Sequence, residues 1–252
     1  MFRRPLLLVS TCWCLAAPAD EPVGRAPVEP QTLPAPDQPV EPVRPSVERL
    51  DDGRMRIGKV VFEPKSREIR FPAVVNMTEG LLEFLVVHEK GKIHEALFAT
   101  DISPTHLNLA FKLLRYPASR ELYSKVNEDG TLSSEFEEAS PEEKAGARIR
   151  IEVEYTDGGA SRKLPVNAWI NHAATERTMP AVPWIYGGSF VYNGKFVAES
   201  SGDVAAIFLS NAAIINFSGE DNENDEVWLP HPTRVPAEGT KVTLVIAPFE
   251  EK

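Results

Sequence analysis

The sequence predicts an α+β fold of predominantly antiparallel β-strands, a sandwich or a barrel-like sheet, with one main buried helix at about residues 103–115. Short apolar runs separated by turn residues recur along most of the chain, as they do in β-sandwiches and barrels. Residues 148–155 alternate between charged and apolar side chains, which is the pattern of a half-solvated strand. Only residues 103–115 combine a capping residue with apolar residues at helical spacing. These observations predict a single domain at residues 48–250.

Residues 1–19 are typical of a secretion signal peptide. Arg3 and Arg4 supply its positive start. Residues 6–17 form an apolar stretch of about twelve residues, shorter than the roughly twenty that span a bilayer. Small residues at positions 17 and 19 predict cleavage before Asp20. We therefore expect an exported protein, periplasmic or extracellular, with no transmembrane helix in the mature chain.

Both cysteines of the chain, Cys12 and Cys14, lie inside this signal. The mature chain therefore has no thiol for a disulfide or a cysteine zinc site, and its stability must come from a hydrophobic core. A lipid anchor at Cys12 is not expected, because Thr11 is bulkier than the residue that usually precedes a lipidated cysteine.

Residues 20–47 predict a disordered, proline-rich tether. The prolines favour an extended polyproline II conformation, which would hold the domain away from a surface. The alternative is a ligand for a proline-recognising domain. The eight prolines lie at positions 22, 27, 30, 34, 36, 39, 42 and 45.

The formal net charge of −10 argues against a nucleic-acid partner. Loss of the signal, which holds two arginines and no acidic residue, leaves the mature chain at −12. Such a chain repels phosphate backbones. The expected partner is a protein or a small molecule of the cell envelope.

Two hairpins are predicted in the first half of the domain. Residues 58–62 and 67–71 flank one short turn, and residues 81–88 and 93–100 flank another. Apolar residues occupy both faces of the second pair, as in strands that are covered on both sides.

The main helix is predicted from its start signal and its apolar face. Ser103 can cap the helix, and Pro104 suits its first position. Its apolar face is predicted to be wide and well buried. The residues of that face are Leu107, Leu109, Ala110, Phe111, Leu113 and Leu114.

Residues 118–146 interrupt the strand pattern with eight acidic residues against three basic ones. They predict a mobile surface insertion with a short helix around residues 121–126. The alternative is an acidic interaction surface.

The second half of the domain is predicted to consist of strands. A turn at residues 157–159 leads from residues 148–155 to a partner strand in which Pro165 predicts an edge or a bulge. Asn193-Gly194 predicts a tight hairpin, because both positions tolerate positive φ. The partner strand is predicted at residues 164–170, and further strands are predicted at residues 204–209 and 241–246.

Four blocks of the chain resemble the YdjY-domain family of bacterial envelope and secreted proteins. They are residues 71–83, 91–97, 187–190 and 224–230. The resemblance covers about residues 55–247, and its most specific block contains His94 and Glu95. Because the family has no assigned activity, the resemblance implies fold and location rather than function. Some members carry a ferredoxin-like description, but the mature chain has no cysteine ligands, so no iron–sulfur cluster is expected.

His94 and Glu95 are the first candidate catalytic residues. They begin an H-E-x-x-H pattern, but Phe98 stands in place of the second histidine, and this zinc motif needs a helix where a strand is predicted. On a strand His94 would share a face with Ala96 and Phe98, and Glu95 would lie on the other face. Both are then expected to be at least partly buried and hydrogen-bonded, in a structural or an active-site role.

Asp101 and His106 are further candidates because they bracket the start of the predicted helix. About 23 Å of extended strand would separate His94 from Asp101, so a metal triad of these three residues is not expected. Asp101 is expected to support the turn into the helix.

Residues 220–226 hold five acidic residues in seven positions. Asp221, Glu223 and Asp225 are candidate ligands for Ca²⁺, which prefers a loop rich in oxygen ligands. The EF-hand pattern fails, because Glu226 stands in place of the required glycine. The alternative is a solvated turn, since Asn and Asp tolerate the left-handed region. No other cofactor is predicted.

The chain shows no nucleophile elbow, phosphate loop or dinucleotide-binding pattern. The leading hypothesis is therefore an exported binding or scaffold module of the bacterial envelope, without catalysis. The alternative is a metal-assisted hydrolase, or another enzyme, that uses His94 and Glu95.

Overall fold

The computed structural model describes residues 45–251 of the 252-residue chain. The predicted signal peptide, Cys12, Cys14 and most of the predicted tether lie outside the described residues. None of the helices formed by residues 45–251 combines the length and the apolar character needed to cross a bilayer.

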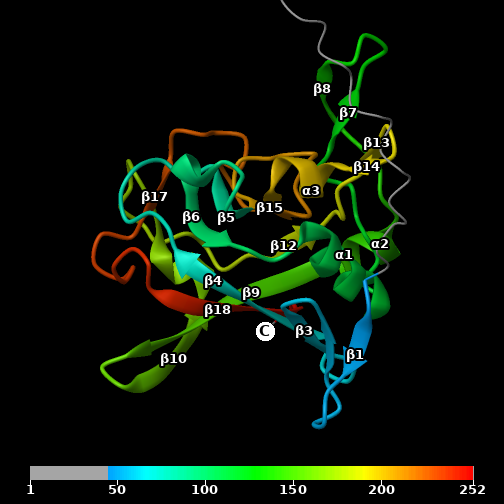
Figure 1. Ribbon diagram of the computed structural model, residues 1–252. Helices are drawn as coiled ribbons and strands as arrows, with labels where there is room; N and C mark the ends of the chain where they lie inside the picture. The colour runs from blue at the N-terminus through cyan, green and yellow to red at the C-terminus, as the bar shows by residue number, and fades with distance from the viewer. Residues whose placement is uncertain (1–44, 252) are drawn as a thin grey trace, which may run out of the picture. The chain divides into compact units, whose positions relative to one another are not determined.

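Eight strands of the main sheet close into a barrel-like ring (Figure 1). The order around the ring is β4 (Glu68–Val75), β18 (Lys241–Pro248), β9 (Arg148–Asp157), β12 (Trp184–Tyr186), β16 (Ile215–Phe217), β15 (Asp203–Ala206), β5 (Phe84–His88) and β6 (Ala96–Thr100). β6 then pairs back with β4, with Val74 opposite Ala99. Among the residues described, only the β5–β6 and β15–β16 pairs are parallel. The predicted α+β fold with a barrel-like, mostly antiparallel sheet is confirmed.

Further strands lie outside the ring. One edge of β4 is shared, because its residues 68–70 pair with β3 while residues 74–75 pair with β6. The strands that extend the sheet are β1 (Val47–Arg49), β2 (Met55–Ile57), β3 (Val60–Glu63) and β10 (Ala160–Pro165). Separate two-stranded pairs are β7 (Ser124–Val126) with β8 (Leu132–Phe136), β11 (Ile170–His172) with β17 (Trp228–Pro230), and β13 (Val191–Tyr192) with β14 (Lys195–Phe196).

Short helices complete the described fold. They are η1 (Ile93–Glu95), α1 (Pro104–Leu113), α2 (Pro141–Gly146), η2 (Val166–Trp169) and α3 (Val197–Ser201). The predicted main helix is confirmed as α1, which is capped by the Ser103 side chain and packs Phe111 on Tyr186 at 4.1 Å between ring centroids. The prediction that Leu113 belongs to the buried face is wrong, since its side chain is 52% exposed. Two helical positions beyond Phe111, it points to the opposite side of the helix.

Several predicted strands are confirmed. β3 and β4 form the first predicted hairpin. In β9 the residues Ile149, Ile151 and Val153 are buried while their charged neighbours are not. Asn193-Gly194 turns between β13 and β14 with φ of 49° and 74°. In the described chain β10 pairs only with β9, so the predicted edge position of Pro165 is confirmed. The predicted strand at residues 164–170 is wrong beyond Pro165, because residues 166–169 form η2.

The predicted hairpin of residues 81–88 and 93–100 is wrong, because β5 and β6 run parallel. Phe84 lies opposite Ala96, and Val86 lies opposite Phe98. After the turn at residues 89–92, η1 carries the chain back along β5 before β6 begins. The hairpin was predicted from the short connection, because parallel strands normally need a dozen or more connecting residues, whereas residues 89–95 suffice here.

The predicted helix at residues 121–126 is also wrong. Residues 124–126 form β7, which pairs with β8 in a hairpin. Tyr123 is only 2% exposed, and its hydroxyl donates to the Ala213 carbonyl and accepts from the Ser189 N–H. The buried Tyr123 side chain fixes the base of the insertion against the barrel. The chain continues from this residue as the strand β7.

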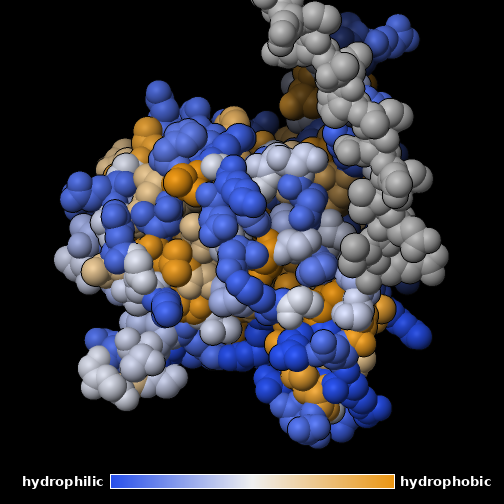
Figure 2. All heavy atoms as spheres, viewed as in Figure 1, coloured by the Kyte–Doolittle hydropathy of each residue, from blue (hydrophilic) through white to orange (hydrophobic). Residues whose placement is uncertain are grey.

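The hydrophobic core draws on every strand of the barrel and on α1. Trp169, Trp184 and Phe98 are among its fully buried large side chains, and the rings of Phe98 and Trp169 lie 5.7 Å apart. On the face shown in Figure 2, hydrophilic residues predominate and hydrophobic ones occur in small scattered groups.

Candidate functional site

His94 and Glu95 lie in η1, just before β6, and not on a strand. The prediction that both would be at least partly buried is wrong for His94, whose side chain is 78% exposed, whereas that of Glu95 is 19% exposed. The reason is that a 3₁₀ turn directs successive side chains around its axis instead of to two alternating faces. The imidazole Nε2 of His94 lies 3.6 Å from a carboxylate oxygen of Glu95.

Asp101 and His106 lie beyond the other end of β6. Asp101 forms an ion pair with Lys59 of the β2–β3 turn. The imidazole of His106 packs against Gly58 of the same turn, where an added Cβ would lie 2.5 Å from Nδ1. The structure therefore does not bring these two residues together with His94.

The three predicted calcium ligands diverge within their loop. Asp221 turns toward His172, with 3.4 Å between its Oδ2 and the imidazole Nε2. Glu223 is exposed, and Asp225 lies close enough to Glu83 to influence its pKa. In residues 45–251 no group of three His, Cys, Asp or Glu side chains is placed to hold a metal ion. The calcium site at Asp221, Glu223 and Asp225 stays a prediction.

Glu83 is a site residue that the sequence analysis missed. The pKa of its carboxyl is raised, first by burial and then by the charges of Glu95 and Asp225, while the charge of Lys92 opposes the shift. The backbone of Glu83 is fixed, because its N–H donates to the Glu95 carbonyl and its own carbonyl accepts from the N–H groups of residues 207 and 208. Glu83, Glu95 and Asp225, here called the acidic cluster, thus come from three separate segments.

Position 83 carried one sequence signal. It is a charged residue immediately before an apolar run, inside one of the blocks that resemble the family, but it was read as part of a strand. Its contact with residue 95 depends on the parallel pairing of β5 and β6, which the sequence did not indicate.

Asp203 lies on the other side of Lys92. Its side chain is only 2% exposed, and one carboxylate oxygen, Oδ1, has no hydrogen-bond partner in the described part of the chain. The second oxygen, Oδ2, accepts a 3.3 Å hydrogen bond from the Ser210 hydroxyl and lies 3.9 Å from the ammonium of Lys92. That ammonium is also 4.7 Å from the centre of the Phe84 ring.

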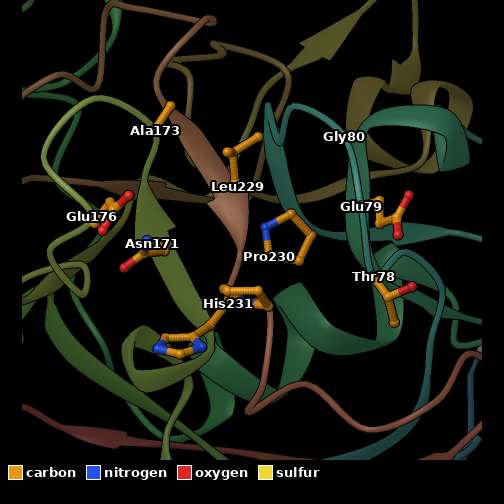
Figure 3. A pocket seen from close by; sticks show the side chains of 10 residues that line it. Thr78, Glu79, Gly80, Asn171, Ala173, Glu176, Leu229, Pro230 and His231 are labelled. Atoms are coloured by element: carbon orange, nitrogen blue, oxygen red, sulfur yellow. The ribbon is translucent and has the colours of Figure 1, made fainter.

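A cavity of about 590 Å³ is lined by residues of three separate segments of the chain (Figure 3). Glu79 and Glu176 lie on opposite sides of it, with Leu229 and Pro230 between them. Burial, followed by the nearby charge of Arg234, lowers the pKa of His231 in its wall. The cavity therefore combines two carboxyl side chains, an imidazole whose pKa is lowered, and the apolar side chains of Leu229 and Pro230.

The cavity and the acidic cluster share two segments of chain. Residues 78–80 line the cavity and lead directly to Glu83. On the other side, Ala173 lines the cavity and donates its N–H to the carbonyl of Val227, two residues after Asp225. The two features border one another at one end of the barrel.

The family model of the YdjY domain matches residues 60–247. The chain belongs to the YdjY-domain family. The matched range contains the whole barrel except the last residue of β18, together with the acidic cluster and the cavity of this YdjY domain. No curated protein and no solved structure gives a significant match to the chain.

Proposed function

We propose that this YdjY-domain protein is a non-catalytic, exported binding module that takes a cationic ligand at the acidic cluster. The observation that carries the proposal is the placement of three acidic residues from separate segments near one another, with the Glu83 N–H bonded to the Glu95 carbonyl at 3.0 Å, and the raised pKa of Glu83 supports it. A carboxyl that lies near like charges is destabilised in its ionised form. A bound cation would relieve this repulsion, so the arrangement favours a positively charged ligand.

The cavity beside the cluster gives such a ligand further contacts. Glu79 and Glu176 extend the negative potential, and Leu229 and Pro230 offer apolar surface to a carbon chain. The net charge of −10 attracts cationic ligands from a distance as well. Export is proposed from the features of residues 1–19, and mass spectrometry of the native amino terminus tests it: a chain that still carries residues 1–19 after secretion would contradict it.

Binding of a tetralysine peptide, followed by isothermal titration calorimetry, tests the proposed site. The variant Glu83→Gln/Glu95→Gln should bind at least about tenfold more weakly than the wild type, because it loses two charge-assisted contacts. The matched control Glu220→Gln/Glu223→Gln removes the same charge from exposed positions of residues 220–226, here called the acidic loop. If both double variants lose affinity equally, only net charge matters and the cluster is not the site.

A hydrolase is the second candidate function, because one observation favours it. A carboxyl with a raised pKa near a second carboxylate resembles the acid and base pair of many hydrolases, and His94 lies beside Glu95. Fluorogenic ester, peptide and glycoside substrates, each with and without Zn²⁺ or Ca²⁺, test this function. Turnover by the wild type that is lost in Glu95→Gln would replace the binding proposal with an enzyme.

A further inference from the structure

We infer that Asp203, Ser210 and Phe84 form a site for a primary ammonium group, and that Lys92 occupies this site in the free protein as a tethered competitor of the ligand. The inference goes beyond the proposed function: it assigns a second cation-binding site, made of residues outside the acidic cluster, and names a residue that limits its affinity. These three residues are called the ammonium site below.

The first observation is the state of the Asp203 carboxylate. A buried carboxylate loses its hydration, and this loss is offset only when its oxygens are paired and hydrogen-bonded. Asp203 is almost fully buried at the start of β15, yet Oδ1 has no partner among residues 45–251 and Oδ2 has a single long hydrogen bond from Ser210. The carboxylate therefore keeps unused capacity to accept from a donor.

The second observation is the position of Lys92. Its ammonium lies 3.9 Å from Oδ2, whereas a direct charge-assisted hydrogen bond is about 2.7–2.9 Å long. The side chain of Lys92 remains 48% exposed, so its ammonium has not left water. Lys92 comes from the turn at residues 89–92 and reaches the site on a flexible four-carbon stem. The ammonium of Lys92 therefore occupies the site loosely, without a direct hydrogen bond to the Asp203 carboxylate.

The third observation is the chemistry that surrounds the ammonium. A carboxylate and the face of an aromatic ring are partners that a primary ammonium uses, and Lys92 Nζ lies 3.9 Å from Asp203 Oδ2 and 4.7 Å from the centre of the Phe84 ring. A ligand ammonium would find the same two partners, with the Ser210 hydroxyl 3.3 Å from the same carboxylate oxygen. The displaced Lys92 would have Glu83 within electrostatic range, and Glu95, Asp225 and His94 are the other titratable groups at that end of the barrel.

Titration of the folded protein with n-butylammonium, followed by amide chemical shifts, tests the inference. The variant Lys92→Met should bind about tenfold more tightly than the wild type if Lys92 fills the site nine-tenths of the time, because apparent affinity scales with the fraction of open sites. Lys90→Met is the matched control, since it removes the same charge from an exposed position of the same turn. Asp203→Asn should abolish the binding. Equal affinity in Lys92→Met and Lys90→Met, or weaker binding in Lys92→Met, would overturn the inference.

Thermal unfolding gives a second readout that does not depend on tight binding. Lys92→Met leaves Asp203 without its nearby cation, so its melting temperature should fall below that of Lys90→Met and should recover as n-butylammonium is added. In Lys92→Met/Asp203→Asn the recovery should vanish, and its persistence would also overturn the inference. Failure of the proposed function appears separately, as equal tetralysine binding by the wild type and Glu83→Gln/Glu95→Gln.

Discussion

Glu83 shows how one side chain acquires its properties from segments that are distant in sequence. Its own neighbours are apolar, but the fold adds Glu95 from η1 and Asp225 from the acidic loop. Each added charge disfavours ionisation of Glu83, in the same direction as burial. The fold thus maintains a group whose ionised form it disfavours.

The sign of this effect gives a pH-dependent prediction. Because the folded-state pKa of Glu83 is raised, folding loses stability as the pH rises from the ordinary glutamate range through that pKa. Glu83→Gln cannot ionise, so it removes this pH-dependent loss of stability, and its side-chain amide can donate toward Glu95. The free energy of unfolding of the variant, relative to that of the wild type, should therefore increase from pH 4 to pH 7. The increase should be less than about 1 kcal/mol, because the Glu83 carboxyl is only partly buried.

Urea unfolding of both proteins at the two pH values measures this gain. Glu223→Gln serves as the control, since Glu223 is exposed in the same loop as Asp225. A Glu83→Gln variant that gains most at pH 4, or that follows the control at both pH values, would contradict the assigned surroundings of Glu83.

At the scale of elements, the turn between β2 and β3 depends on a glycine. Gly58 has φ of 56°, and a Cβ at this position would lie 2.5 Å from Nδ1 and 2.9 Å from Cε1 of His106. The close approach places α1 against the hairpin, which also holds Lys59 for its ion pair with Asp101. His106 therefore has a packing role at the start of α1.

Gly58→Ala should lower the free energy of unfolding more than Gly53→Ala does. Gly53 also has positive φ, 89°, but nothing lies within 4 Å of its added Cβ. Gly53→Ala should cost about 1–2 kcal/mol from backbone strain, and Gly58→Ala about 1–3 kcal/mol beyond that from the collision. Chemical denaturation measures both. Equal losses of unfolding free energy in the two variants would show that the His106 side chain moves aside without an energetic cost.

Elements whose signal is local could be predicted, and those that depend on pairing could not. Ser103 and Pro104 marked the start of α1, and Asn193-Gly194 marked a hairpin, because each signal resides in adjacent residues. β12 and β16, with three residues each, are too short to show a period and were missed. The parallel direction of β5 and β6 could not be predicted, because their short connection indicates a hairpin. The contact between Glu83 and Glu95 depends on this pairing, so it could not be predicted either.

The candidate site could be predicted only in part, because local motifs indicate some of its residues and tertiary contacts determine the others. His94, Glu95 and Asp225 were chosen from local motifs, and the structure places the last two near Glu83. Asp203 was not chosen, because a single acidic residue at the start of a strand gives no sign of its burial. Only the closed sheet removes it from water.

For the molecule as a whole, stability should decrease from the barrel to the separate two-stranded pairs. β4, β18 and β9 lie side by side with long ladders, whereas β7–β8 and β13–β14 carry exposed apolar residues such as Val126 and Tyr192. Isolated pairs of strands are marginally stable in water.

Native-state hydrogen exchange should therefore separate these regions. Amides of β4, β18 and β9 should exchange only by global unfolding, and those of β7–β8 and β13–β14 through local opening that costs at least about 3 kcal/mol less. NMR or mass spectrometry of exchanged protein measures the difference. Uniform protection would show that the hairpins are integral to the barrel.

The place of β18 has a consequence for biosynthesis. In chain order β4 is the first strand of the ring and β18 the last, yet β18 lies between β4 and β9 and bonds to both. While a ribosome is still adding residues before 241, no partner exists for those two edges and the ring stays open. The domain is thus unable to close its barrel until its final strand has been made.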